Sequence, residues 1–133
     1  MKKYFYPAVF HPEDEGYSVS FPDFPGCFTQ GDTMSEASEM AFDAMGLYLE
    51  DKKPAQYPEP TRLENIKLQN KDRVVLIPFS PLAYAQKWDT HAVRKSLTLP
   101  AWLNNLADEK HVNYSHILQE ALKQELMVNE DHK

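Results

Sequence analysis

The stretch that decides the fold is FPDFPGCFTQGDT, residues 21–33, which contains the only cysteine of the chain. Pro25-Gly26 predicts a tight turn, because proline presets φ and glycine accepts a positive φ. The turn lies between YSVSF (17–21), which alternates apolar and polar residues, and the short segment CFTQ (27–30). Both segments are typical of β-strands, so we expect an antiparallel hairpin with Cys27 in its apolar lining.

A further strand is predicted upstream of this hairpin. KKYFYPAVF (2–10) is rich in aromatic and β-branched residues, and the charged segment HPEDEG (11–16) predicts the turn that follows it. Three strands joined by such short loops form an antiparallel meander. The segment MKKYFYPAVF begins like a signal peptide, but Pro7 interrupts its apolar run and no small-residue cleavage site follows, which favours a strand.

A helix is predicted downstream of the hairpin. Thr33-Met34-Ser35-Glu36 fits a capping box, in which the threonine oxygen accepts a backbone N–H and the glutamate reaches back. The helix is expected over residues 34–51. Its apolar stripe consists of Ala37, Met40, Ala41, Ala44, Met45 and Tyr48, and its acidic face of Glu36, Glu39, Asp43 and Glu50. The acidic face is either a solvated surface or a landing surface for a basic protein.

The sequence after the helix completes a first domain. Residues 53–72 carry three prolines and are mostly polar, which predicts an irregular excursion. RVVLIPF (73–79) is a nearly continuous apolar run and predicts a fourth, well-buried strand. The order β-β-β-α-β predicts an α+β domain over residues 1–80, with one helix on an antiparallel sheet. Residues 81–92 show no clear period and are expected to be a linker.

The last third, residues 93–130, has a different pattern. RKSLTLP (94–100) alternates as a strand does, and two helical stripes follow, separated by a break at which Asn113 is a good N-cap. A unit of this size cannot bury enough surface alone, so we expect it to fold as a homodimer. Whether such dimers pair into tetramers is left open by the sequence.

The predicted strand of this unit presents a polar face. Arg94, Ser96 and Thr98 lie on one side, and Leu97 and Leu99 on the other. Two such strands paired across a dimer form a ribbon that fits the major groove of DNA, where these side chains can contact base edges. The start of the second helix, Asn113-Tyr114-Ser115, would offer free amides to a backbone phosphate. The alternatives are a surface hairpin or a plain helical dimerisation unit.

Nothing in the sequence predicts catalysis, a metal or a cofactor. A cysteine nucleophile needs a base, and only His11 falls in the same predicted domain as Cys27, in an expected loop beside three acids. CxxC, HxxxH and phosphate-loop motifs are absent from the sequence. We therefore expect a protein without enzymatic activity, in which Cys27 is structural.

The charge of the chain favours some partners over others. Residues 1–92 hold 9 Lys+Arg and 14 Asp+Glu, a net of −5, while residues 93–133 hold 5 and 6, a net of −1. The acidic first part allows a basic partner and argues against nucleic acid as its own ligand. No apolar stretch approaches the roughly 18 residues of a membrane helix, and a single cysteine suits a reducing compartment, so a cytoplasmic protein is expected.

Both parts of the sequence resemble known families. The segment over residues 4–51, and above all SFPDFPGCFTQGDT (20–33), closely resembles the N-terminal domain of HicB antitoxins. The resemblance implies a partial RNase H-like sheet that binds and silences a HicA-type toxin, an mRNA-cleaving ribonuclease. Candidate toxin contacts are the acidic helix residues Glu36, Glu39 and Asp43, and the loop residues Asp23 and Phe24.

The tail over residues 94–126 looks like a ribbon-helix-helix domain. The resemblance maps the groove-reading positions onto Arg94, Ser96 and Thr98, and the phosphate-binding helix start onto Asn113, Tyr114 and Ser115. It implies binding to operator DNA and repression of the chain's own operon. A ligand-responsive repressor with a small-molecule-sensing first domain is the alternative. An RNase H-like nuclease ranks third, because no predicted strand carries an acid at its centre.

Overall fold

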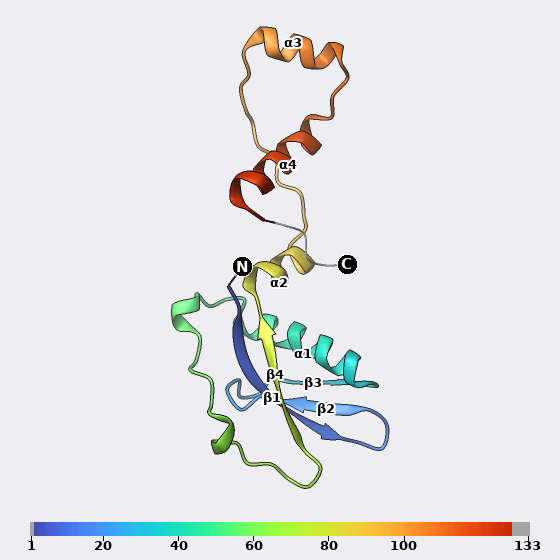
Figure 1. The fold of residues 1–133 in the computed structure, drawn as a ribbon, viewed down its shortest axis with the longest axis vertical. Helices are drawn as coiled ribbons and strands as arrows, with labels where there is room; N and C mark the ends of the chain where they lie inside the picture. The colour runs from blue at the N-terminus through green and yellow to red at the C-terminus, as the bar shows by residue number, and fades with distance from the viewer. Residues whose placement is uncertain (1, 129–133) are drawn as a thin grey trace. The chain divides into compact units, whose positions relative to one another are not determined.

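The computed structural model describes residues 2–128, which form two compact units. The first unit extends to Trp88 and the second begins at Asp89 (Figure 1). The last two residues of the predicted second domain, 129 and 130, lie outside the described residues. Among the described residues no helix combines the length and the apolar character needed to cross a membrane.

The first unit is built on a four-stranded antiparallel sheet with the order β3-β2-β1-β4. The strands are β1 (Tyr4–Pro12), β2 (Tyr17–Ser20), β3 (Phe28–Gly31) and β4 (Arg73–Phe79). The predicted meander of the first three strands is confirmed, with the third beginning one residue later than expected. The predicted strand over residues 73–79 is confirmed with the expected bounds. The expectation that it is well buried is wrong, because β4 lies at the edge of the sheet and Leu76 is 49% exposed.

The long strand β1 contains Pro7, which the pairing register accommodates. β2 pairs with residues 9–12 of β1, and β4 pairs with residues 4–10. Pro7 therefore lies where β1 has a neighbouring strand on one side only, so its missing N–H costs no ladder bond between β1 and β2.

The hairpin that the sequence indicates between β2 and β3 contains two successive backbone turns. Phe24 N–H donates to the Phe21 carbonyl at 3.2 Å, and Cys27 N–H donates to the Phe24 carbonyl at 3.0 Å. Gly26 has φ of 81°. This value lies in the left-handed region that glycine adopts without strain, which confirms the predicted turn.

Helix α1 (Met34–Leu49) begins at the predicted cap. Glu36 N–H donates to Thr33 Oγ1 at 3.1 Å, and Asp32 N–H donates to Glu36 Oε1 at 3.1 Å. The glutamate therefore reaches back as expected, one residue beyond the N-cap. Ala37, Ala41, Met45 and Leu49 are fully buried and pack this helix on one face of the sheet.

The core between the sheet and α1 is largely aromatic. The sheet side supplies Tyr6, Phe10, Val19, Ile77 and Phe79. Phe24, from the hairpin, lies between the layers: its ring centroid is 4.7 Å from that of Tyr6 and 4.7 Å from that of Tyr48. Because side chains alternate along a strand, Val9, His11 and Ser20 point to the opposite, outer face of the sheet.

The irregular excursion is confirmed and is held to the sheet by specific contacts. It contains two short 3-10 turns, η1 (Pro54–Gln56) and η2 (Leu63–Asn65). Tyr6 Oη donates to the Pro58 carbonyl at 2.6 Å. Burial raises the pKa of Tyr6 to about 12, so the hydroxyl keeps its proton and remains a donor at neutral pH.

Helix α2 (Pro81–Trp88) replaces most of the expected linker. The expected linker over residues 81–92 therefore begins only after Trp88, because α2 packs on α1 and belongs to the first unit. Lys87 Nζ lies 2.9 Å from Asp43 Oδ1, and a Cβ at Gly46 would lie 2.0 Å from Cε1 of Tyr84. Because Gly46 of α1 has no side chain, the ring of Tyr84 can pack directly against the backbone of α1.

The second unit consists of an irregular segment and two helices, α3 (Ala101–Glu109) and α4 (Tyr114–Leu126). His111, with φ of 54°, lies in the break between them, and the Asn113 side chain accepts from His116 N–H at 3.0 Å, which confirms the predicted cap. Residues 89–100 belong to no helix or strand of this chain. A strand that pairs with a second chain needs that chain, so the predicted ribbon stays a prediction.

Candidate functional sites

The loop after β2, where two toxin contacts are predicted, is held within the first unit. Asp23 accepts two hydrogen bonds from Thr61, at 2.9 Å from the backbone N–H and at 2.7 Å from the hydroxyl. Phe24 is 1% exposed and lies in the core. The apolar ring is therefore used for packing in this chain, and the predicted contact of Phe24 with a toxin stays a prediction.

The predicted acidic face of α1 is partly occupied by contacts within the chain. Glu36 caps the helix, and Asp43 accepts from Lys87 and from Trp88 Nε1, the latter at 3.2 Å. Glu39 makes a looser ion pair with Lys87 at 3.9 Å, and its side chain is 72% exposed. Glu39 is thus accessible to a partner, while Asp43, whose side chain is 21% exposed, mainly fixes α2.

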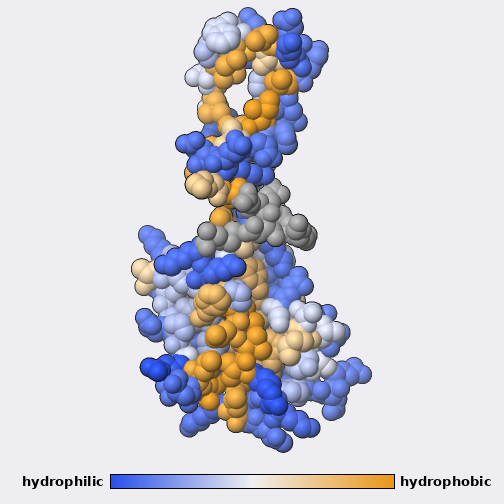
Figure 2. Space-filling view, viewed as in Figure 1, coloured by the Kyte–Doolittle hydropathy of each residue, from blue (hydrophilic) through white to orange (hydrophobic). Residues whose placement is uncertain are grey.

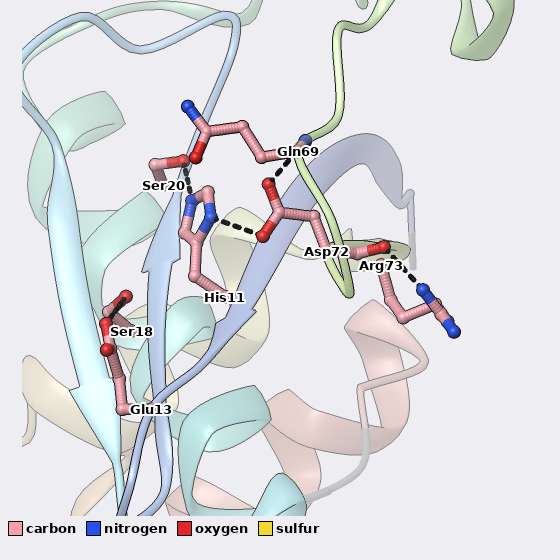
Figure 3. Close-up of polar contacts among 7 residues, drawn as sticks. All are labelled: His11, Glu13, Ser18, Ser20, Gln69, Asp72 and Arg73. Atoms are coloured by element: carbon pink, nitrogen blue, oxygen red, sulfur yellow. Dashed lines mark hydrogen bonds and ion pairs between the residues drawn. The ribbon is translucent and has the colours of Figure 1, made fainter.

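A contact set that the sequence did not indicate lies on the outer face of the sheet (Figure 3). His11 Nε2 lies 2.9 Å from Ser20 Oγ, and His11 Nδ1 lies 2.9 Å from Asp72 Oδ1. The expectation that His11 lies in a loop beside acidic neighbours is wrong, because β1 continues to Pro12. Asp72 is 61 positions away in the sequence, so no local motif connects the two residues.

The carboxylate of Asp72 determines how the protons of this set are arranged. Gln69 N–H donates to Asp72 Oδ2 at 3.0 Å, and this bond, assisted by the contact with His11, lowers the pKa of the carboxyl group. An ionised carboxylate only accepts, so the hydrogen of a neutral imidazole lies on Nδ1. The lone pair then lies on Nε2, and the Ser20 hydroxyl donates to it.

The set opens onto a pocket of about 290 Å³. Val9, Phe21, Pro22 and Ile66 supply its apolar walls, and His11, Ser20, Thr61, Asn65 and Lys67 supply its polar groups. The outer face of the sheet therefore carries a concave site with a positive charge and several hydrogen-bond donors.

Cys27 lies beneath α1 and is half-buried. Its Sγ donates to the Ala44 carbonyl at 3.6 Å, and burial raises the pKa of the thiol. A raised pKa leaves less thiolate at neutral pH, so this environment does not activate a nucleophile. Within residues 2–128 no three His, Cys, Asp or Glu side chains are grouped to hold a metal ion.

We expect the purified protein to cleave neither RNA nor DNA, with or without magnesium. We also expect Cys27→Ser to change the free energy of unfolding by only about 1 kcal/mol or less, because the serine hydroxyl can keep the hydrogen bond to the Ala44 carbonyl. Gel assays on labelled RNA and DNA and a urea titration measure the two effects. Cleavage that disappears in Cys27→Ser would contradict the structural role of this residue.

The predicted DNA-contacting residues are accessible. Arg94, Ser96 and Thr98 are exposed in the segment before α3, and Ser115 is exposed at the start of α4. The side chain of Asn113 caps α4 by accepting from His116 N–H. The backbone amides of Tyr114 and Ser115 are the ones that a phosphate at this helix end could contact. Tyr114 Oη donates to the Asp108 carboxylate, and this bond raises the pKa of the tyrosine. Tyr114 thus joins the two helices of the unit.

The helices of the second unit contain no buried residue among those described. Their exposed apolar residues include Trp102, Leu106, Ile117, Leu122 and Leu126. Figure 2 shows apolar side chains along both helices of this unit, and a second patch over β1 and β4 of the first. Over the part of the chain that the structure describes, the apolar stripes of α3 and α4 therefore cover no buried core, which is consistent with a partner helix pair.

Comparison of the sequence with models of known protein families identifies the class of protein to which the chain belongs. The model described as the HicB-like antitoxin of bacterial toxin–antitoxin systems matches residues 6–122. The chain belongs to this family.

Named relatives agree with that assignment. Antitoxin HicB 1 of Photorhabdus laumondii is 48% identical over 60 residues, which cover 41% of this chain and 39% of the relative. Antitoxin HicB of Escherichia coli K12 is 38% identical over 80 residues, covering 56% and 53%. The chain thus spans less than two thirds of these two antitoxins. An uncharacterised 14.9 kDa protein of Haemophilus phage HP1 is 31% identical over 108 residues, covering 78% and 79%.

A solved structure extends the similarity over nearly the whole chain. A chain from a toxin–antitoxin complex of Streptococcus pneumoniae aligns with 93% of this chain and 99% of its own length, with 25% identity and a TM-score of 0.56. The combination of an antiparallel sheet with helices therefore has a structural counterpart.

Proposed function

We propose that this chain is an antitoxin that binds a HicA-type, mRNA-cleaving toxin, blocks its active site, and represses its own operon by binding operator DNA. The family match over residues 6–122 is the observation that carries the proposal. The likeness to a chain of the Streptococcus pneumoniae toxin–antitoxin complex supports it.

The first unit is proposed to bind the toxin. It comprises the four-stranded antiparallel sheet with α1 on one face, which we propose to be a partial RNase H-like sheet. Helix α2 extends the proposed toxin-binding domain from residue 80 to residue 88. The net charge of −5 over residues 1–92 supports a basic partner. Charge complementarity of this kind mainly speeds association and makes it sensitive to salt.

The second unit is proposed to be a ribbon-helix-helix domain that dimerises and binds DNA. The unburied apolar stripes of α3 and α4 support a homodimer, because a second copy would cover them. In that dimer the segments at residues 94–100 would pair as a two-stranded ribbon, with Arg94, Ser96 and Thr98 toward the major groove. The helix start at residues 113–115 would contact a phosphate.

Co-expression with the toxin tests the first half of the proposal. The toxin gene expected beside this one encodes a short basic protein, and its product should stop cell growth alone and leave growth unaffected when this chain is present. Purified toxin should lose its ribonuclease activity when the full chain is added in equimolar amounts. A neighbouring gene of another kind, and no effect on a HicA-type ribonuclease, would favour a small-molecule-responsive repressor.

Glu39→Lys tests whether α1 contacts the toxin. The exposed carboxylate has only a loose contact within the chain, so the change should reduce the association rate several-fold at low salt and less at high salt. Asp14→Lys, in the turn after β1, makes the same change of net charge at another place and is the matched control. The association rates with the toxin are measured by stopped flow. Equal rates for the two variants would mean that the net charge of the chain alone changes the rate and that α1 is not the contact surface.

A further inference from the structure

The side chains of Ser20, His11 and Asp72 form a hydrogen-bonded series of hydroxyl, imidazole and carboxylate. Acyl-transfer sites use the same series, with the serine as nucleophile, the histidine as its base and the carboxylate as the group that orients the histidine. Both contacts are 2.9 Å long, and each uses a different nitrogen of the His11 ring. Figure 3 shows the three side chains in line across β2, β1 and the segment before β4. None of the three is among the residues proposed above to contact the toxin or DNA.

We propose that Ser20 is an activated nucleophile that accepts an acyl group from small activated acyl donors with an anionic leaving group. Asp72 holds the His11 ring so that Nε2 faces the Ser20 hydroxyl and can take its proton. Asp72 is itself buried and fixed by Gln69, so the base is oriented before a donor arrives. Residue 20 would thus be a site of covalent modification on the outer face of the sheet.

The pocket next to Ser20 suits a donor of this class. Its volume of about 290 Å³ admits a small ester or an acyl phosphate rather than a long chain. Lys67 lines the pocket and supplies a positive charge for an anionic leaving group. Asn65, also in the lining, carries a side-chain amide that can donate to the carbonyl oxygen as it becomes negative.

The step is a simple transfer in which no group is oxidised or reduced. Ser20 Oγ attacks the carbonyl carbon, and its proton passes to His11 Nε2 as the Oγ–C bond forms. The bond from the carbonyl carbon to the leaving oxygen breaks, and the leaving group departs with the electron pair. His11 then releases its proton to the solvent, and the product is an ester on Ser20.

Ser18 provides a matched control within the same strand. Its side chain lies two residues away, on the same face of the sheet, and its hydroxyl donates to Glu13 Oε1 at 2.9 Å. Ser18 therefore has a carboxylate partner at the same distance as Ser20 has an imidazole. A carboxylate hydrogen bond alone gives no comparable base, so only Ser20 is expected to react.

The test uses the full chain and p-nitrophenyl acetate. We expect a burst of p-nitrophenolate close to one equivalent of protein and an acetyl ester on Ser20, located by peptide mass spectrometry. Ser18→Ala should keep both the burst and the ester, and Ser20→Ala should lose both. Acetylation confined to lysines, equal occupancy of Ser18 and Ser20, or no burst in the wild type would overturn the proposal.

His11→Ala separates an activated serine from a merely accessible one. The variant should acetylate Ser20 about a hundredfold more slowly or worse, since about a hundredfold is the lower end of the effect of a general base. Added imidazole should restore part of the rate, which a purely structural role of His11 would not allow. If the variant acetylates Ser20 at the wild-type rate, His11 takes no part and the proposal fails.

Discussion

Phe24→Ala should destabilise the first unit by about 3–5 kcal/mol, the usual cost of removing a large aromatic side chain from a core. Phe24 is 1% exposed and its ring contacts Tyr6, Phe21 and Tyr48. A loss of this size is comparable to the total stability of many small domains. We therefore expect the variant to be largely unfolded at 37 °C, as measured by urea titration with circular dichroism detection.

Phe28→Ala is the matched control for this change. Phe28 belongs to the same hairpin but is 72% exposed, so its removal should change the free energy of unfolding by no more than about 0.5 kcal/mol. The pair also separates folding from toxin binding. A Phe24→Ala protein that keeps wild-type stability but loses the toxin would show that the ring is a contact after all.

Arg94→Ala should weaken binding to DNA from the chain's own promoter about tenfold or more and relax the sequence preference. A bidentate contact between an arginine and guanine contributes about 1–3 kcal/mol of discrimination, and Arg94 is the only arginine in the predicted ribbon. The dimer should remain intact, because the strand pattern places Leu97 and Leu99 on the opposite face. Toxin binding should survive, since it is proposed for the first unit.

Lys95→Ala is the control for the loss of charge alone. It removes the same positive charge from the neighbouring position, on the other side of the predicted strand. It should weaken binding to operator and scrambled DNA alike, as loss of a phosphate contact does, without changing the preference between them. Fluorescence titrations of the three proteins on both DNAs measure this difference. An Arg94→Ala protein with wild-type affinity and preference would favour a helix-turn-helix use of residues 101–126.

Local signals in the sequence were sufficient to predict the hairpin between β2 and β3 and the start of α1. Pro25-Gly26 presets a turn, and Thr33 with Glu36 marks a helix start, because each depends on neighbouring residues only. The burial of β4 could not be predicted in the same way. An apolar run such as residues 73–79 is typical of a central strand, and only the pairing of β4 with β1 alone places it at an edge.

Helix α2 and the Ser20–His11–Asp72 set were missed for a related reason. The contact of Lys87 with Asp43 and that of His11 with Asp72 join residues far apart in the sequence. Neither has a spacing that marks it, so tertiary structure alone brings these groups together. The sequence also could not show that Phe24 and Asp43 contact residues from elsewhere in the chain, Phe24 through Tyr6 and Tyr48 and Asp43 through Lys87.

The edge position of β4 has a consequence for self-association. An exposed strand edge offers unpaired backbone groups to another chain and can start the growth of ordered aggregates. β4 carries Arg73 at its beginning and Pro78, which has no N–H, near its end, and β3 at the other edge has only four residues. A proline, a charge and a short strand are features by which natural sheets limit such pairing. The sheet can thus leave an apolar strand at its margin without providing a template for fibril formation.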